Sequence, residues 1–271
     1  HSEQRGNKIM DERLISVDLR AQFGFLKKPD TNEGIYLTYN CLHKPALLGI
    51  LGAIVGLGGY AQAYSVKKDL FPDYYQKLKH LKIGIQPLDS AKGNFQKTVI
   101  TYNNSVGYAN LDGGTLIVSE QTLLTPAYRV FLLLSVEEIL EVQLYGNLKT
   151  GESEYIPYLG KNDFQLWWEN FTEYEFEANH FPKESYQVET IFVKRKDRSI
   201  RDSRVILPIF DFSQQQPDNF IYLEELPFEF DEKIKHYSKK SFAFSNWKVV
   251  KEYALDNLFL LKSEQKIIQL V

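Results

Sequence analysis

One stretch decides the fold of this chain: TYNCLHKPALLGILGAIVGLGGY, residues 38–60. Pro45 suits the first turn of a helix, where its missing N–H costs no hydrogen bond, and the glycine pair at 58–59 supplies a stop. The pattern predicts a helix over residues 45–57. Because none of these residues is charged, the helix must be buried on most of its circumference. At about 1.5 Å per residue it reaches only about 20 Å, too short for a membrane core of about 30 Å.

The glycines, the cysteine and the histidines of the chain form no known cofactor or metal motif. Gly49, Gly52 and Gly56 share one helix face and let a neighbouring backbone approach closely, but their spacing matches neither a dinucleotide fingerprint nor a Walker loop. The single cysteine, Cys41, excludes an internal disulfide and a cysteine-rich metal site. Five scattered histidines show no ligand spacing. We therefore expect neither a nucleotide cofactor nor a metal.

Composition limits the possible classes of protein. The 271 residues can form one large domain or a domain with an appendage, and the 44% hydrophobic content is ample for a core. A net charge of −3 does not indicate a nucleic-acid binder, so any RNA would bind to local patches. Aromatic residues make up 14% and can fill a core or stack on bases. Without a signal peptide or a long apolar segment, the sequence predicts a cytoplasmic protein with no membrane partner.

Hydrophobic periodicity in the first half predicts the order strand, helix, strand, long insertion, strand, helix, strand. This is the order of an α+β, ferredoxin-like domain of the kind that RNA-recognition motifs also use. The second helix opens with an apparent capping box, Ser135 followed by Glu138. The predicted strands cover residues 13–20, 81–87, 128–134 and 155–159, and the predicted helices cover residues 45–57 and 135–145.

The insertion, residues 88–116, is rich in Asn, Gly and Lys with β-branched and aromatic residues among them. It is too long for an ordinary connection, and such excursions are binding elements or disordered loops. We interpret it as a polar β-hairpin that projects from the sheet. Residues 1–12 are interpreted as a leader or tag remnant, residues 13–164 as the ferredoxin-like domain, and residues 165–271 as a smaller β-rich appendage.

Three motifs resemble the Cas-five family of the RAMP superfamily, the subunit that caps the 5′ end of the guide RNA in type I CRISPR surveillance complexes (Cascade). The polar and aromatic lead ending at Pro45, with the run ALLGILGAIVGL after it, resembles that family's first helix. The loop LGKND, residues 159–163, resembles its loop of leucine, glycine and a basic residue. Residues 226–228, LPF, resemble a short motif near its C-terminal end. Beyond Phe164 the likeness weakens.

The resemblance implies a non-catalytic subunit, most similar to the type I-B branch, that acts in antiviral defence. It would hold the 5′ handle of the guide RNA (crRNA) and join the backbone subunits to the large subunit, and it would meet target DNA only through the assembled complex. The insertion at 88–116 would form a thumb that packs against a neighbouring subunit. The RNA-binding residues implied are Lys27, Lys28, Tyr39, Lys44, Lys92, Lys97, Gly160 and Lys161.

Two other functions stay open on the sequence. One branch of the family cuts precursor guide RNA without metal through a tyrosine, lysine and histidine set, which Tyr39 with His43 and Lys44, or Lys79 with His80, could imitate. A protein-interaction scaffold without RNA contact is the other. The basic run at residues 194–204 fits a nucleic-acid contact, a contact with the large subunit or an exposed hairpin tip.

Overall fold

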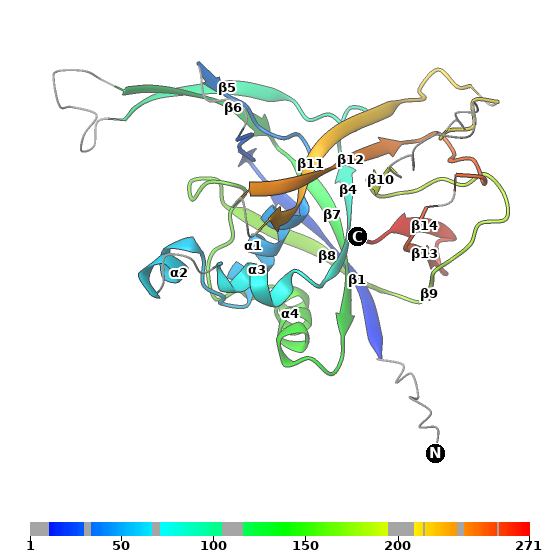
Figure 1. Ribbon diagram of the computed structural model, residues 1–271, viewed down its shortest axis with the longest axis horizontal. Coiled ribbons are helices and arrows are strands. Elements are labelled where there is room, and N and C mark those ends of the chain that lie inside the picture. Colours follow the sequence, from blue (N-terminus) through cyan, green and yellow to red (C-terminus); the bar gives the residue numbers. More distant parts are fainter. Residues whose placement is uncertain are drawn as a thin grey trace.

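A four-stranded antiparallel sheet lies at the centre of the molecule (Figure 1). The computed structural model describes residues 11–29, 34–66, 71–104, 116–194, 209–213, 215–231, 236–253 and 255–271. The strand order is β4-β7-β1-β8, and every neighbouring pair is antiparallel. The bounds are β1 Glu12–Ala21, β4 Lys82–Leu88, β7 Ala127–Ser135 and β8 Leu166–Tyr174.

Both faces of this sheet are covered, because successive side chains of a strand point to opposite sides. Ile15 and Val17 of β1 and Val130 of β7 belong to the core cluster that also contains the helix side chains. Leu14 and Phe131 point the other way, into a second cluster built with the C-terminal strands. The helices are α1 Lys44–Ile54, α2 Tyr60–Val66, α3 Asp73–Leu78 and α4 Ile139–Thr150.

The described elements after β8 are all strands. They form two small sheets, with orders β10-β12-β11 and β14-β13-β9, and β11 and β12 are a long antiparallel hairpin that lies beside α1. The prediction of a mixed α+β chain is confirmed, and its described part is rich in sheet with few helices. No helix among the described residues is long and apolar enough to cross a membrane. The bounds are β9 Phe176–Ala178, β10 Phe192–Val193, β11 Ile221–Asp231, β12 His236–Ser245, β13 Leu258–Leu261 and β14 Lys266–Gln269.

A second hairpin projects from the body of the molecule (Figure 1). It consists of β5 Lys97–Asn104 and β6 Leu116–Leu124, joined by residues that lie outside the described ones. The predicted end of the insertion at residue 116 is wrong, because the chain there only begins its return strand. β6 runs on to Leu124 since its second half also pairs with two short strands, β2 Phe23–Gly24 and β3 Ile35–Tyr36.

The predicted fourth strand at residues 155–159 is wrong. This segment makes only an isolated bridge between Tyr158 and Gln165, and the strand beside β1 is instead β8. Pro157 lacks the N–H that a strand at this edge would need. The aromatic run from Leu166 instead forms the backbone hydrogen bonds with β1. The central sheet therefore extends past residue 164, into the part that the sequence assigned to the C-terminal region.

Helix ends also differ from the prediction. α4 begins at Ile139, and the expected capping box is wrong because Ser135 still belongs to β7, opposite Glu12. The Ser135 N–H donates to the Glu141 carboxylate at 2.7 Å. α1 ends at Ile54 rather than residue 57, since Gly56 has a left-handed φ of 75°.

Candidate nucleic-acid interface

A cleft of about 1010 Å³ opens beside the first turns of α1. Most of its lining comes from residues 25–29, α1, the start of α2 and the loop at 155–161, and single residues of α3, β6 and the β11–β12 hairpin complete it. One face of α1 buries Leu47 and Leu51 in the core, and this fixes the position of the helix. Its opposite face is turned toward the cleft and forms one wall. The cleft therefore rests on the most buried helix of the molecule.

Six tyrosines line the cleft and give it an aromatic character. Three of them, Tyr60 on α2 and Tyr155 and Tyr158 in the loop, are 51%, 54% and 43% exposed. Half-exposed aromatic rings can stack with unpaired bases. Every base has a flat face, so such stacking does not depend on the nucleotide sequence. The lining tyrosines are Tyr39, Tyr60, Tyr74, Tyr155, Tyr158 and Tyr237.

Charged side chains in the cleft wall are Lys27, Lys161 and Glu120. The Lys27 ammonium lies 3.9 Å from the centre of the Tyr36 ring. The Lys161 ammonium lies 2.6 Å from the Glu120 carboxylate and 3.4 Å from the Tyr102 hydroxyl. Burial lowers the pKa of Lys161, but its hydrogen bonds to Glu120 and Tyr102 outweigh this and raise the pKa overall. Lys161 is therefore cationic at neutral pH.

Gly160 closes one end of the cleft. Its φ is 88°, and a Cβ there would collide with the Phe25 carbonyl oxygen. The turn is tied down on both sides, since the Phe25 N–H donates to the Leu159 oxygen at 3.1 Å and the Leu159 N–H donates to the Phe164 oxygen at 2.8 Å. Gly160, an RNA-binding residue implied by the resemblance, thus allows a close approach of two backbone segments, and its partner is the Phe25 carbonyl group.

The structure thus brings four of the eight predicted residues, Lys27, Tyr39, Gly160 and Lys161, into one cleft. The exposed tyrosines Tyr60, Tyr155 and Tyr158 were missed. In the sequence, Tyr155 and Tyr158 stand on either side of Pro157 in a segment that resembles a strand, and Tyr60 follows the glycine pair. These positions are the only signal that could have indicated them.

The other four predicted residues lie outside the cleft lining. Lys28 pairs with Glu224 at 3.5 Å, and Lys44 donates to the Val271 main-chain oxygen at 3.1 Å while burial lowers its pKa to about 8. Lys97, implied as an RNA-binding residue of the thumb, donates to the Asn40 side chain at 2.9 Å, and burial lowers its pKa. Lys92 is exposed in the tight turn at residues 91–94.

The lead into α1 is held by a buried polar network. Glu224 of β11 accepts hydrogen bonds from the main-chain N–H groups of Asn40 and Cys41, at 3.1 and 3.0 Å. The Asn40 side chain in turn bonds the Gly93 oxygen and the Phe95 N–H, at 2.7 and 3.0 Å. The C-terminal hairpin and the base of the β5–β6 hairpin therefore position the first turn of α1 and the wall of the cleft.

His43 caps α1 rather than presenting a titrating imidazole. Its Nδ1 accepts from the Ala46 N–H at 3.3 Å, the side chain is only 9% exposed, and burial lowers its pKa to about 3. The second candidate, His80, contacts the Glu141 carboxylate at 2.8 Å and does not line the cleft. Among the described residues, no group of His, Cys, Asp or Glu side chains converges on a point that could hold a metal ion.

The buried His43 predicts a pH dependence of stability. Its pKa is lower in the folded chain, about 3 against 6.5, so the unfolded chain binds the proton first as the pH falls. Stability from this group is complete above about pH 6.5 and is lost toward pH 3, at up to about 1.4 kcal/mol per pH unit. We expect His43→Asn, which keeps a capping side chain, to be about 2 kcal/mol less acid-sensitive at pH 5.

Urea unfolding of both proteins at pH 7 and pH 5 measures this difference, because other titrating groups act equally in the two. Equal losses of unfolding free energy in wild type and variant would show that His43 is not a buried neutral group.

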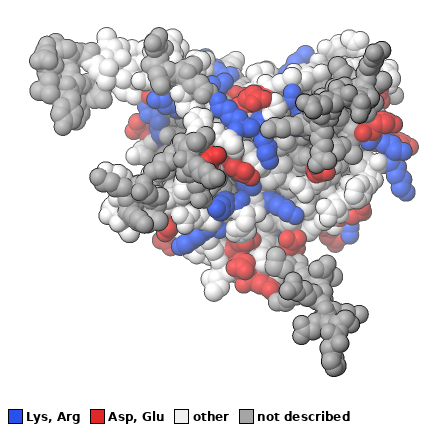
Figure 2. All heavy atoms as spheres, viewed as in Figure 1, with Lys and Arg blue, Asp and Glu red and all other residues white. Residues whose placement is uncertain are grey.

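Charge on the face seen in Figure 2 is mixed. Lys and Arg side chains lie among Asp and Glu rather than in one basic patch. This agrees with the net charge of −3. The basic run at 194–204 lies outside the described residues except for Lys194.

Comparison with known proteins gives likenesses only at the level of structure. No known protein family matches the chain, and no curated protein matches it. The described fold is similar to chains of CRISPR proteins. A chain of a "CRISPR RNA-guided surveillance complex" is 13% identical with a TM-score of 0.43, over 87% of this chain and 90% of that one.

Two further structures are similar over nearly the full length. A CRISPR protein from Archaeoglobus fulgidus is 11% identical with a TM-score of 0.45, over 94% of this chain and 97% of that one. A chain of the Type III-B Cmr-beta complex bound to cognate target RNA and AMPPnP is 11% identical with a TM-score of 0.46, over 95% and 99%. At TM-scores below 0.5 these likenesses decide neither the fold nor the function of this chain.

Proposed function

We propose that this chain is an RNA-binding subunit of a type I CRISPR surveillance complex that holds the 5′ handle of the guide RNA in the aromatic cleft. The observation that carries the proposal is the convergence of Lys27, Gly160 and Lys161, three residues implied by the Cas-five resemblance, on one cleft. Its exposed tyrosines would stack on splayed bases and its two lysines would meet phosphates.

The element order supports the same assignment. The strands of the central sheet and the two longer helices come in the order β1, α1, β4, β7, α4 and β8, with only short elements between them. The β5–β6 hairpin leaves the sheet between β4 and β7. We propose that this unit is the ferredoxin-like domain of the Cas-five family and that the hairpin is its thumb, which packs against a neighbouring subunit. The chain as a whole would join the backbone subunits to the large subunit. Assignment to type I-B and contact with target DNA through the complex belong to the same proposal.

The proposed role is not catalytic. A ribonuclease built on Tyr39, His43 and Lys44 would need an imidazole that exchanges a proton near neutral pH. Burial keeps the pKa of His43 near 3, and its Nδ1 is occupied by the Ala46 N–H. The geometry therefore favours a structural histidine at the start of α1.

One assay tests binding and cleavage together. The purified chain is incubated with labelled single-stranded CRISPR repeat RNA in EDTA, at about 50 and 200 mM salt, and followed by fluorescence anisotropy and by gel electrophoresis. We expect binding that weakens with salt and RNA that stays intact. Specific cleavage that is lost in His43→Ala would contradict the non-catalytic role, and absence of binding even at the lower salt would contradict RNA recognition by this chain.

A further inference from the structure

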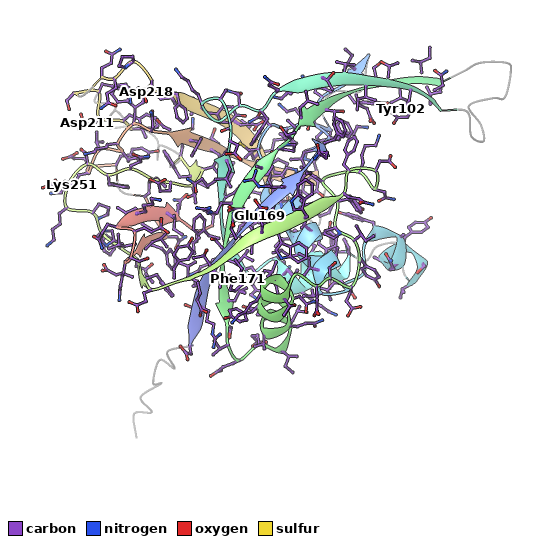
Figure 3. The ribbon with its side chains drawn as sticks, turned by 180° about the vertical axis from the view of Figure 1, so that it is seen from behind. Tyr102, Glu169, Phe171, Asp211, Asp218 and Lys251 are labelled. Atoms are coloured by element: carbon purple, nitrogen blue, oxygen red, sulfur yellow. The ribbon has the colours of Figure 1, made fainter. Side chains whose placement is uncertain are left out.

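Lys161, the cation of the glycine loop, is already occupied by an anion of the same chain. Its ammonium lies 2.6 Å from one oxygen of Glu120, and the Tyr102 hydroxyl donates to the other at 3.0 Å. Glu120 is 9% and Lys161 25% exposed, so water screens this pair only in part. Tyr102, labelled in Figure 3, comes from β5 and Glu120 from β6. The hairpin therefore places a carboxylate where an RNA phosphate would bind.

Three aromatic rings also surround the Lys161 ammonium. The rings of Tyr102, Phe164 and Phe25 have their centres 4.7, 5.7 and 5.9 Å from Nζ. Ring faces attract a cation at such distances. Because these three rings flank the ammonium, it should keep its position when the charge of Glu120 is removed.

Glu120 has a large influence on the net charge of the cleft lining. The charged residues of the cleft lining are Lys27, Lys161 and Glu120, which give a net charge of +1 while His43 is neutral. Removing the carboxylate charge alone doubles the net charge of the cleft to +2. No other single substitution of a lining residue by a neutral one raises this charge.

We propose that the Glu120 carboxylate competes with a phosphate of single-stranded RNA for the Lys161 ammonium and so limits the affinity of the cleft. The inference rests on the proposed RNA-binding function. When RNA enters the cleft, Lys161 exchanges its ion pair with Glu120 for an ion pair with an RNA phosphate. Because one ion pair replaces another, this contact adds little to the net release of salt ions. A strand that can make several other contacts is thereby favoured over a short or random anion.

Glu120→Gln is the decisive variant, because its amide keeps the shape and still accepts from Tyr102. We expect single-stranded repeat RNA to bind about three- to tenfold more tightly, and the slope of log affinity against log salt to steepen by about 0.7, as one more phosphate contact releases ions. In a Lys161→Met background the same change should give a clearly smaller gain, because only the general change in cleft charge remains. Glu152→Gln, an exposed site outside the cleft lining, is the control for total charge.

Anisotropy titrations of wild type and the four variants, each checked for folding by thermal melting, give distinguishable results. Two results would overturn the inference and leave the proposed function standing. One is that RNA binds Glu120→Gln no more tightly than Glu152→Gln. The other is that Glu120→Gln raises the RNA affinity equally with and without Lys161. Absence of RNA binding in every protein would overturn the proposed function and the inference with it. Glu120→Ala replaces the glutamine variant if that one does not fold, with the same two criteria.

Discussion

Gly160→Ala should destabilise the chain by about 3 kcal/mol or more, which for a protein of this size is a fall in Tm of about 10 °C. Two costs add at this position. An alanine with a φ of 88° is strained, and its Cβ would collide with the Phe25 carbonyl oxygen, a backbone atom that cannot swing aside. Urea or thermal unfolding of the variant measures the sum.

Two other glycines separate the two costs. Gly151, at the end of α4, has a φ of 79° but nothing within 4 Å of the added Cβ, so Gly151→Ala should cost only about 1–2 kcal/mol. Gly146 lies inside α4 with open space and helical φ, so Gly146→Ala should gain up to about 1 kcal/mol. If Gly160→Ala is no worse than Gly151→Ala, the close approach to Phe25 that shapes this end of the cleft is wrong.

The double variant Tyr60→Ala, Tyr158→Ala should weaken binding of single-stranded repeat RNA about 100-fold. These rings line the cleft from two separate parts of the chain, and each stacked base is worth about 1–3 kcal/mol. Both side chains are about half exposed, so their loss should leave the melting temperature nearly unchanged. Anisotropy at constant salt measures the loss.

Tyr64→Ala is the matched control for this loss. Tyr64 lies on α2 like Tyr60 and is 62% exposed, but it does not line the cleft. It should bind RNA like wild type. An equal loss in Tyr64→Ala and the double variant would place the RNA on the outer surface of α2, and no loss in either would remove the cleft tyrosines from recognition.

The strongly patterned parts of the chain could be predicted from its sequence. The helix α1, uncharged after Lys44, and the strands β1, β4 and β7 can be predicted from local periodicity, because each must bury a face that its own residues define. β8 was missed because its pairing with β1 depends on a partner more than a hundred residues away, while Pro157 and its tyrosines imitate a short edge strand nearby. Tertiary pairing decides between such competitors.

The site was predicted in part for a related reason. Gly160 and Lys161 stand in a recognisable loop, but the partners of a lysine are set by the fold. Lys97 turns to Asn40 and Lys28 to Glu224, and neither acceptor is near its lysine in sequence. The exposed tyrosines of α2 and the loop at 155–158 carry no pattern that separates a stacking ring from a core ring. Only their shared position on one cleft shows what they have in common.

The most direct test of the account is to find where RNA touches the chain. Labelled single-stranded CRISPR repeat RNA is cross-linked to the folded protein by ultraviolet light at low salt, and the modified peptides are identified by mass spectrometry. We predict cross-links on the peptides that carry Tyr60, Tyr155 and Tyr158, the exposed tyrosines of the cleft. Cross-links confined to the C-terminal strands, with none at these tyrosines, would contradict the assignment of the cleft as the RNA site.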